Sequence, residues 1–195
     1  MINDSIKFLV QSIEKSPVLE KNGCNYQILQ DVFPNELVQE LSACDPTSVS
    51  TKKLERQSAY PRVRVDYAET ISKKLNLIFK STKITELFES KYNLKLVAQT
   101  ADIWFDSKGY NLTPHTDDPR LAMSMQIYLD TNENVPGTAL FESKDAVTPF
   151  CQFKYERNNG YSLLNNQSGY HGTAFAMETT GIRKSVYVRY GKRTY

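Results

Sequence analysis

The stretch LAMSMQIYLD, residues 121–130, decides the fold class of this chain. Its large apolar side chains alternate with small or polar ones, and this two-residue period is typical of a strand with one face in a core. One face carries Leu121, Met123, Met125, Ile127 and Leu129, and the other carries Ala122, Ser124, Gln126, Tyr128 and Asp130. We expect the apolar face to pack under helices and the polar face to point into the interior of a barrel.

A second stretch, RKSVYVR at residues 183–189, has the same period. Its polar face carries Arg183, Ser185, Tyr187 and Arg189. Two polar faces inside one domain are costly to bury unless they line a wet pocket or hold an ionic ligand. The two stretches together therefore predict a site inside the barrel.

The remainder of the C-terminal half is typical of short strands separated by turn residues. Strands are predicted at 96–105, 111–115, 121–130, 138–142, 150–155, 161–164, 169–176 and 184–190. Eight short strands at this spacing indicate a sandwich or an open jelly-roll barrel.

The N-terminal half carries helical patterns instead. Helices are predicted at 34–41, 68–79 and 84–92, with one alternating strand at 60–67. We find no linker, repeat or low-complexity tract, so we expect one domain over residues 1–195. In this interpretation, residues 1–95 form a helical support region packed on one sheet, and residues 96–195 form the barrel core.

Composition limits the classes of protein that need to be considered. The 195 residues include 24 basic and 22 acidic side chains, and a net charge of +2 is too small to indicate nucleic acid or membrane as a partner. Cys24, Cys44 and Cys151 form no CxxC pair, which favours a reducing compartment over a disulfide framework. There is no signal-peptide core and no apolar run that could span a bilayer, so we expect a cytoplasmic protein.

The chain has only two histidines, and both lie where a metal site would need them. His115 and Asp117 are two residues apart after a predicted strand, so on an extended segment their side chains point the same way. His171 follows in a later strand. Two imidazoles and one carboxylate on one face of a metal are the ligand set of non-haem Fe(II) oxygenases. A lone H-x-D tripeptide arises often by chance, but its order with the later histidine favours the metal interpretation.

Arg183 follows His171 by twelve residues and shares a face with Ser185. An arginine in a strand is more often a solvated edge residue or an ion-pair partner. Here Arg183 is expected on the inward-facing side of the strand, which favours a binding function. A guanidinium can hold a carboxylate through two parallel charge-assisted hydrogen bonds. Ser185 and Tyr128 can each add a hydroxyl donor.

These residues resemble the 2-oxoglutarate/Fe(II)-dependent dioxygenase superfamily, in particular its prolyl 4-hydroxylase-like branch. The resemblance covers roughly residues 96–190 and implies a double-stranded β-helix, the jelly-roll or cupin-like barrel. It implies that His115, Asp117 and His171 are the metal ligands and that Arg183 and Ser185 hold the far carboxylate of 2-oxoglutarate. Tyr128 looks like the cosubstrate tyrosine of that branch, and the helix opening at Phe33–Glu36 resembles its N-terminal support.

The resemblance also implies an activity. The cofactors would be Fe(II), 2-oxoglutarate as cosubstrate and O2, with ascorbate as a candidate reductant. The reaction would be hydroxylation of a C–H bond in a peptide, protein or amino-acid substrate, coupled to decarboxylation of 2-oxoglutarate to succinate. The aromatic residue that contacts the cosubstrate before the metal motif is left open among Trp104, Phe105 and Tyr110.

Two other functions remain open at this point. Arg183 and Arg189 form an R-x5-R pattern that resembles the AlkB-like nucleic-acid demethylases, and Tyr60, Arg62, Arg64 and Tyr67 would be its base platform and basic groove. An alternating strand beside the core explains the same four residues, so nucleic acid is the less favoured partner. The third possibility is a catalytically silent or zinc-binding barrel, although a structural zinc site normally has four protein ligands.

Overall fold

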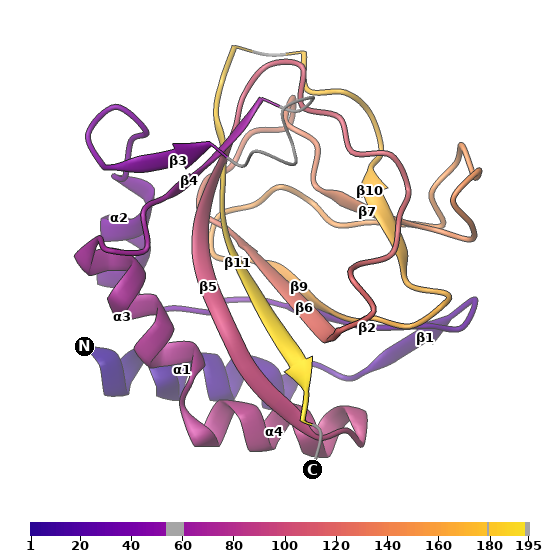
Figure 1. Cartoon of the computed structure of the whole chain (residues 1–195), viewed down its shortest axis with the longest axis horizontal. Coiled ribbons are helices and arrows are strands. Elements are labelled where there is room, and N and C mark those ends of the chain that lie inside the picture. The colour runs from indigo at the N-terminus through magenta and orange to yellow at the C-terminus, as the bar shows by residue number, and fades with distance from the viewer. Residues whose placement is uncertain (54–60, 179, 194–195) are drawn as a thin grey trace.

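The computed structural model describes residues 1–53, 61–178 and 180–193 (Figure 1). Its four helices are α1 (Ile2–Lys15), α2 (Asn35–Ser42), α3 (Thr70–Phe79) and α4 (Thr82–Tyr92). The strands of the N-terminal half are β1 (Leu19–Lys21), β2 (Cys24–Leu29), β3 (Thr51–Lys53) and β4 (Arg62–Val65). Those of the C-terminal half are β5 (Leu96–Asp106), β6 (Leu121–Tyr128), β7 (Thr138–Phe141), β8 (Cys151–Gln152), β9 (Gly160–Leu164), β10 (Tyr170–Thr173) and β11 (Arg183–Lys192).

The strands form two antiparallel sheets, as expected for a jelly roll. The larger sheet has the order β1-β2-β9-β6-β11-β5-β4-β3, and the smaller sheet has the order β10-β7-β8. In Figure 1 the helices lie on one side of β5 and β11, and β7 and β10 lie on the other. The predicted mainly-β fold with helices packed on one sheet is therefore confirmed.

Two apolar cores follow from this layering. The first lies between the larger sheet and the helices and contains Met123, Met125, Ile127 and Leu129 of the 121–130 stretch. The second lies between the two sheets and contains Tyr128. From Met123 onward, the alternation thus separates the helix side from the interior side as the sequence predicts.

The N-terminal half contributes more strands than the sequence pattern indicated. The three predicted helices are present as α2, α3 and α4, and the predicted strand is present as β4. In addition, β1 and β2 form one edge of the larger sheet, and β3 forms the other edge beside β4. The β1–β2 hairpin turns at Asn22 and Gly23, and both have positive φ, which is common in two-residue hairpin turns. Tyr60, the first residue of the predicted 60–67 strand, lies outside the described residues. Within those residues, no helix has the length and apolar character needed to cross a membrane.

Candidate metal centre

The fold brings the three predicted metal ligands together. The nearest ligand atoms of His115, Asp117 and His171 all lie within 4.8 Å of one another. The two histidines face each other across an isolated antiparallel bridge, with N–H···O distances of 3.0 and 2.8 Å between their backbones. A backbone bridge of this kind fixes the two imidazoles side by side, with ring centroids 4.5 Å apart.

Backbone carbonyls decide which nitrogen of each imidazole faces the centre. Nδ1 of His115 lies 3.0 Å from the carbonyl oxygen of Thr113, and Nδ1 of His171 lies 3.0 Å from that of Gly169. A carbonyl can only accept, so both Nδ1 atoms carry the hydrogen and both Nε2 atoms are left with a lone pair. Burial, and then the neighbouring His171, lower the pKa of His115, which favours the neutral form that a metal needs.

The carboxylate is oriented by a half-buried tyrosine. The hydroxyl of Tyr187 donates to Asp117 at 3.2 Å from each carboxylate oxygen. Tyr187 packs against Trp104, with ring centroids 4.8 Å apart. Burial, and then the charge of Asp117, raise the pKa of Tyr187, so this hydroxyl stays a donor. Support of this kind fixes the direction from which a carboxylate reaches a metal.

The ligands border a small cavity of about 70 Å³ between the two sheets. At its inner end lies Arg183, which is only 1% exposed. Nη1 of Arg183 donates to Asp106 at 2.7 Å and Nη2 donates to Thr138 Oγ1 at 3.2 Å, but its Nε has no partner among the described atoms. A buried guanidinium N–H without an acceptor is costly, and a carboxylate ligand would satisfy it.

Ser185 and Tyr128 do not line this cavity, but they form hydrogen bonds with two residues that do, Gln126 and Thr138. Ser185 Oγ accepts a hydrogen bond from Gln126 Nε2 at 2.8 Å, and the hydroxyl of Tyr128 accepts one from the backbone N–H of Thr138 at 2.7 Å. The cavity itself is lined by Gln126, Thr138 and Tyr161 beside Arg183. Gln126 could have been found from the sequence, because it shares the inward face of 121–130 with Tyr128.

A second arginine that sequence reasoning did not assign to the cosubstrate site also lines the cavity. Arg62 donates through Nε and Nη2 to the two carboxylate oxygens of Asp106, and its guanidinium stacks 4.0 Å from the ring of Trp104 and 4.5 Å from that of Tyr110. Of the three aromatic candidates before the metal motif, Trp104 and Tyr110 line the cavity, whereas Phe105 belongs to the core under the helices.

The charges around the cavity are balanced. Arg62 and Arg183 oppose Asp106 and Asp117, so the surroundings carry no net formal charge while the imidazoles are neutral. Burial by itself would lower the pKa of Arg183, but Tyr128 and Asp106 outweigh it and raise that pKa, so the guanidinium stays charged. A divalent metal together with a dianionic cosubstrate would leave this balance unchanged. The residues present therefore fit both groups.

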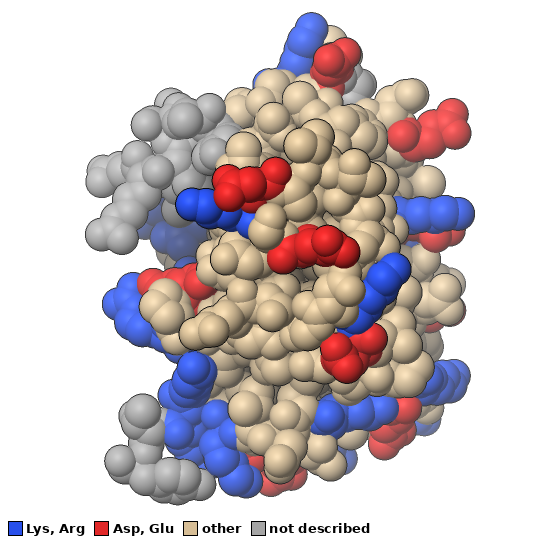
Figure 2. All heavy atoms as spheres, turned by 90° about the vertical axis from the view of Figure 1, so that its right-hand side faces the viewer, with Lys and Arg blue, Asp and Glu red and all other residues tan. Residues whose placement is uncertain are grey.

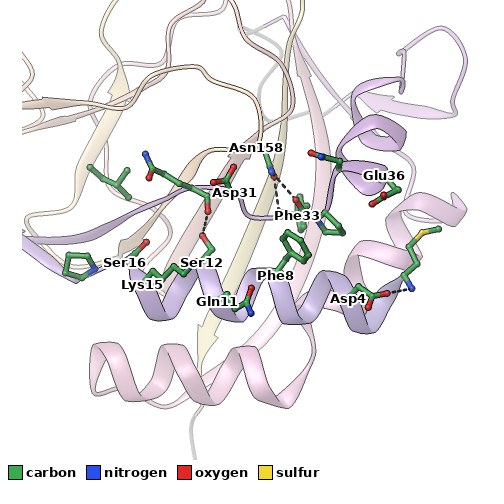
Figure 3. Close-up of a pocket in the computed structure, with 16 residues that line it drawn as sticks. Asp4, Phe8, Gln11, Ser12, Lys15, Ser16, Asp31, Phe33, Glu36 and Asn158 are labelled. Carbon is green, nitrogen blue, oxygen red and sulfur yellow. Dashed lines mark hydrogen bonds and ion pairs between the residues drawn. The ribbon is translucent and has the colours of Figure 1, made fainter.

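A wider groove of about 1270 Å³ lies elsewhere, between α1 and residues 28–36 (Figure 3). Several of its polar groups already have partners. Ser12 donates a hydrogen bond to the carbonyl of Gln30, and Asn158 accepts one from the backbone N–H of Phe33 and donates one to its carbonyl. The one group of candidate metal ligands found in the described part of the chain is the trio in the small cavity. The chemistry is therefore expected in the small cavity and not in this groove.

Comparison with known proteins supports the fold assignment. No protein-family model matches the chain, and no curated protein sequence matches it. Among solved structures, HygX from Streptomyces hygroscopicus with nickel and 2-oxoglutarate bound is similar at a TM-score of 0.63 and 13% identity, covering 87% of this chain and 84% of that one. A Pseudomonas putida prolyl-4-hydroxylase is similar at 0.63 and 13%, covering 97% of this chain and 100% of that one.

A third similar structure is the Trichoplax adhaerens prolyl hydroxylase in complex with a hypoxia-inducible-factor peptide fragment. Its TM-score is 0.64 at 12% identity, covering 97% of this chain and 91% of that one. At these identities the likeness concerns the fold alone. This chain has the jelly-roll fold of the 2-oxoglutarate/Fe(II) oxygenases, prolyl hydroxylases among them.

Proposed function

We propose that this protein is a 2-oxoglutarate-dependent non-haem iron dioxygenase that hydroxylates a C–H bond. One observation carries the proposal: two imidazoles with bare Nε2 atoms and one carboxylate meet at a cavity whose inner wall is a buried arginine with an unpartnered N–H. Three protein ligands leave positions open on a metal, as oxygen activation requires and as a closed structural zinc site does not.

Each residue then has a defined task. His115, Asp117 and His171 would hold Fe(II), and Arg183 would bind the far carboxylate of 2-oxoglutarate, supported by Ser185 and Tyr128 through Gln126 and Thr138. Bound iron and cosubstrate would supply the oxidising chemistry, with O2 as oxidant, succinate as product and ascorbate as a reductant that restores Fe(II). The protein positions these groups, and the packed Trp104–Tyr187 pair would help to shield them from water.

The substrate that we favour is a peptide, a protein or an amino acid, as in a prolyl-hydroxylase-like enzyme. One observation weighs against nucleic acid. The surface in Figure 2 shows basic and acidic side chains interspersed over much of one face. Nucleic acid is more often bound by a continuous basic surface. The free thiols of Cys24, Cys44 and Cys151 fit a reducing compartment such as the cytoplasm.

The metal assignment can be tested without any substrate. The purified protein with Fe(II) and 2-oxoglutarate under anaerobic conditions should show a weak metal-to-ligand charge-transfer band in the visible. His171→Ala and Asp117→Ala should abolish the band. Asp118→Ala is the matched control, because this neighbouring carboxylate lies at the surface and pairs with Arg120. A band that survives His171→Ala would contradict the ligand assignment.

The substrate class needs a separate assay. Succinate release should be screened with proline-containing peptides and free amino acids against methylated oligonucleotides. Stimulation by the peptides or the amino acids is the expected result. Stimulation by the oligonucleotides alone would favour the AlkB-like alternative.

A further inference from the structure

A second arginine–aspartate–arginine cluster lies on the inward face of the larger sheet, outside the cavity described above. Its centre is Asp102, a fully buried residue of β5. Nη2 of Arg189 lies 3.3 Å from Asp102 Oδ2 and 2.7 Å from Thr100 Oγ1, whereas Nη1 of Arg64 lies 3.9 Å from the same carboxylate oxygen. The three charged side chains carry a net positive charge.

This outer cluster repeats the arrangement of the inner one. In each, an aspartate of β5 lies between an arginine of β4 and an arginine of β11. The inner cluster is Arg62, Asp106 and Arg183, and the outer one is Arg64, Asp102 and Arg189. Trp104 and Tyr187 separate the two clusters.

The two clusters differ in how far they are open to solvent. The side chains of Arg62 and Arg183 are 5% and 2% exposed, whereas those of Arg64 and Arg189 are 29% and 31% exposed. The outer arginines can therefore meet a ligand that arrives from solution. The inner arginines can meet only a ligand that has entered the cavity.

The outer cluster also has unused hydrogen-bonding capacity. Asp102 Oδ1 and Arg64 Nε are buried without a partner among the described atoms. The long contact to Asp102 is the single interaction of the Arg64 side chain that we find in the described part of the protein. A guanidinium held this loosely is free to turn toward an anion, and leaving it unpaired is costly.

The position of the cluster relative to the metal ligands limits the size of the ligand. Tyr187 lies directly opposite Asp102 in the strand register and donates to the metal ligand Asp117. Arg189 is two residues further along β11, and two residues of an extended strand span roughly 7 Å. The arginine pair is therefore one inward-facing position away from Tyr187, the residue that supports Asp117, which favours a small ligand over a long one.

We infer that Arg64 and Arg189 bind the carboxylate of the primary substrate, and that this substrate is a small carboxylic acid such as a free amino acid. This inference rests on the proposed function and narrows it, because the main chain in the interior of a long peptide carries no carboxylate. Asp102 is a positioning residue that holds Arg189 and limits the movement of Arg64.

The test uses the full-length protein with Fe(II) and 2-oxoglutarate. Aliphatic L-amino acids and simple monocarboxylic acids of about four to six carbons are each paired with the corresponding carboxamide, and succinate release is measured. We expect at least one acid to stimulate release with a KM about tenfold below that of its amide, the effect of one charge-assisted hydrogen bond. Fluorescence of Trp104, the only tryptophan, should report binding of the same acid under anaerobic conditions.

The variants separate this inference from a loss of folding and from a failure of the proposed function. Arg64→Gln, which breaks only one long contact, should raise the KM for the acid about tenfold while keeping kcat and the visible charge-transfer band. Arg157→Gln, at an exposed arginine, should change neither. If the band forms but each acid has the same KM as its amide, or no acid stimulates succinate release, the inference is overturned and the metal assignment stands. If the band does not form, the proposed function itself fails.

Discussion

Replacing Asp106 by asparagine tests the buried charge network beside the metal cavity. Asp106 is fully buried and accepts hydrogen bonds from two nitrogens of Arg62 and from Nη1 of Arg183. Asparagine keeps the shape of the side chain but removes the charge. Two guanidiniums would then remain buried with no carboxylate between them.

The expected cost is large because Asp106 and both arginines are buried. Removing one partner of a buried ion pair typically destabilises a protein by about 3–5 kcal/mol. Asp106 serves two guanidiniums, so we expect Asp106→Asn to lower the free energy of unfolding by an amount in the upper part of that range. This is a considerable fraction of the roughly 5–15 kcal/mol that holds a typical domain folded.

The chain provides a matched control for the assay. Asp118 also accepts from Nε and Nη2 of one arginine, Arg120, but these two side chains are 40% and 83% exposed. A solvated pair contributes at most about 1 kcal/mol, so Asp118→Asn should change stability little. Both variants are compared with the parent protein by urea unfolding of the metal-free protein, followed by circular dichroism.

The cofactors provide a second readout. Asp106→Asn gives the cavity one unbalanced positive charge, which the dianion of 2-oxoglutarate would partly neutralise. At a fixed metal concentration, addition of 2-oxoglutarate should therefore stabilise Asp106→Asn more than it stabilises the parent protein. If Asp106→Asn costs no more than Asp118→Asn, the buried network does not have the energetic importance that we assign to it.

Three further predictions concern single side chains. Arg183→Lys should weaken 2-oxoglutarate binding at least tenfold, because an ammonium cannot reproduce the guanidinium fork; a titration of the visible band that matched the parent protein would contradict this. Tyr187→Phe removes the hydroxyl that donates to both oxygens of Asp117 and should lower Fe(II) affinity about tenfold, measured by competition with a metal chelator; unchanged affinity would show that Asp117 needs no such support. Burial raises the pKa of the Cys24 thiol to about 12, so the thiolate is scarce below that pH. Alkylation of Cys24 in the folded protein at pH 9 should therefore be far slower than after unfolding in urea, and equal rates would contradict the raised pKa.

The N-terminal half contains elements that the sequence analysis did not assign. Helix α1 has four buried positions, and two of them, Ser5 and Ser12, are polar, but Ile2, Ile6, Leu9 and Ile13 recur at helical spacing, so a local signal was present. The two serines are satisfied by the carbonyl oxygens of Met1 and Gln30, and the second of these bonds exists only in the folded protein. The β1–β2 hairpin likewise had a local signal in Asn22-Gly23.

The grouping of the candidate metal ligands could be predicted from residue type and spacing. His115 and Asp117 are two residues apart, and their ligand atoms lie within 4.8 Å of each other and of His171, although the predicted strand at 111–115 is reduced to an isolated bridge at His115. The inward faces of 121–130 and 183–189 follow from alternation alone. These are local properties of an extended backbone, and one sequence is enough to read them. The charge network was not readable in this way. Arg62 and Asp106 are 44 residues apart and meet only because β4 lies beside β5 in the sheet. A two-residue period tells which face a side chain occupies, whereas strand order and register decide which side chain lies opposite, and these arise only when the whole sheet is assembled.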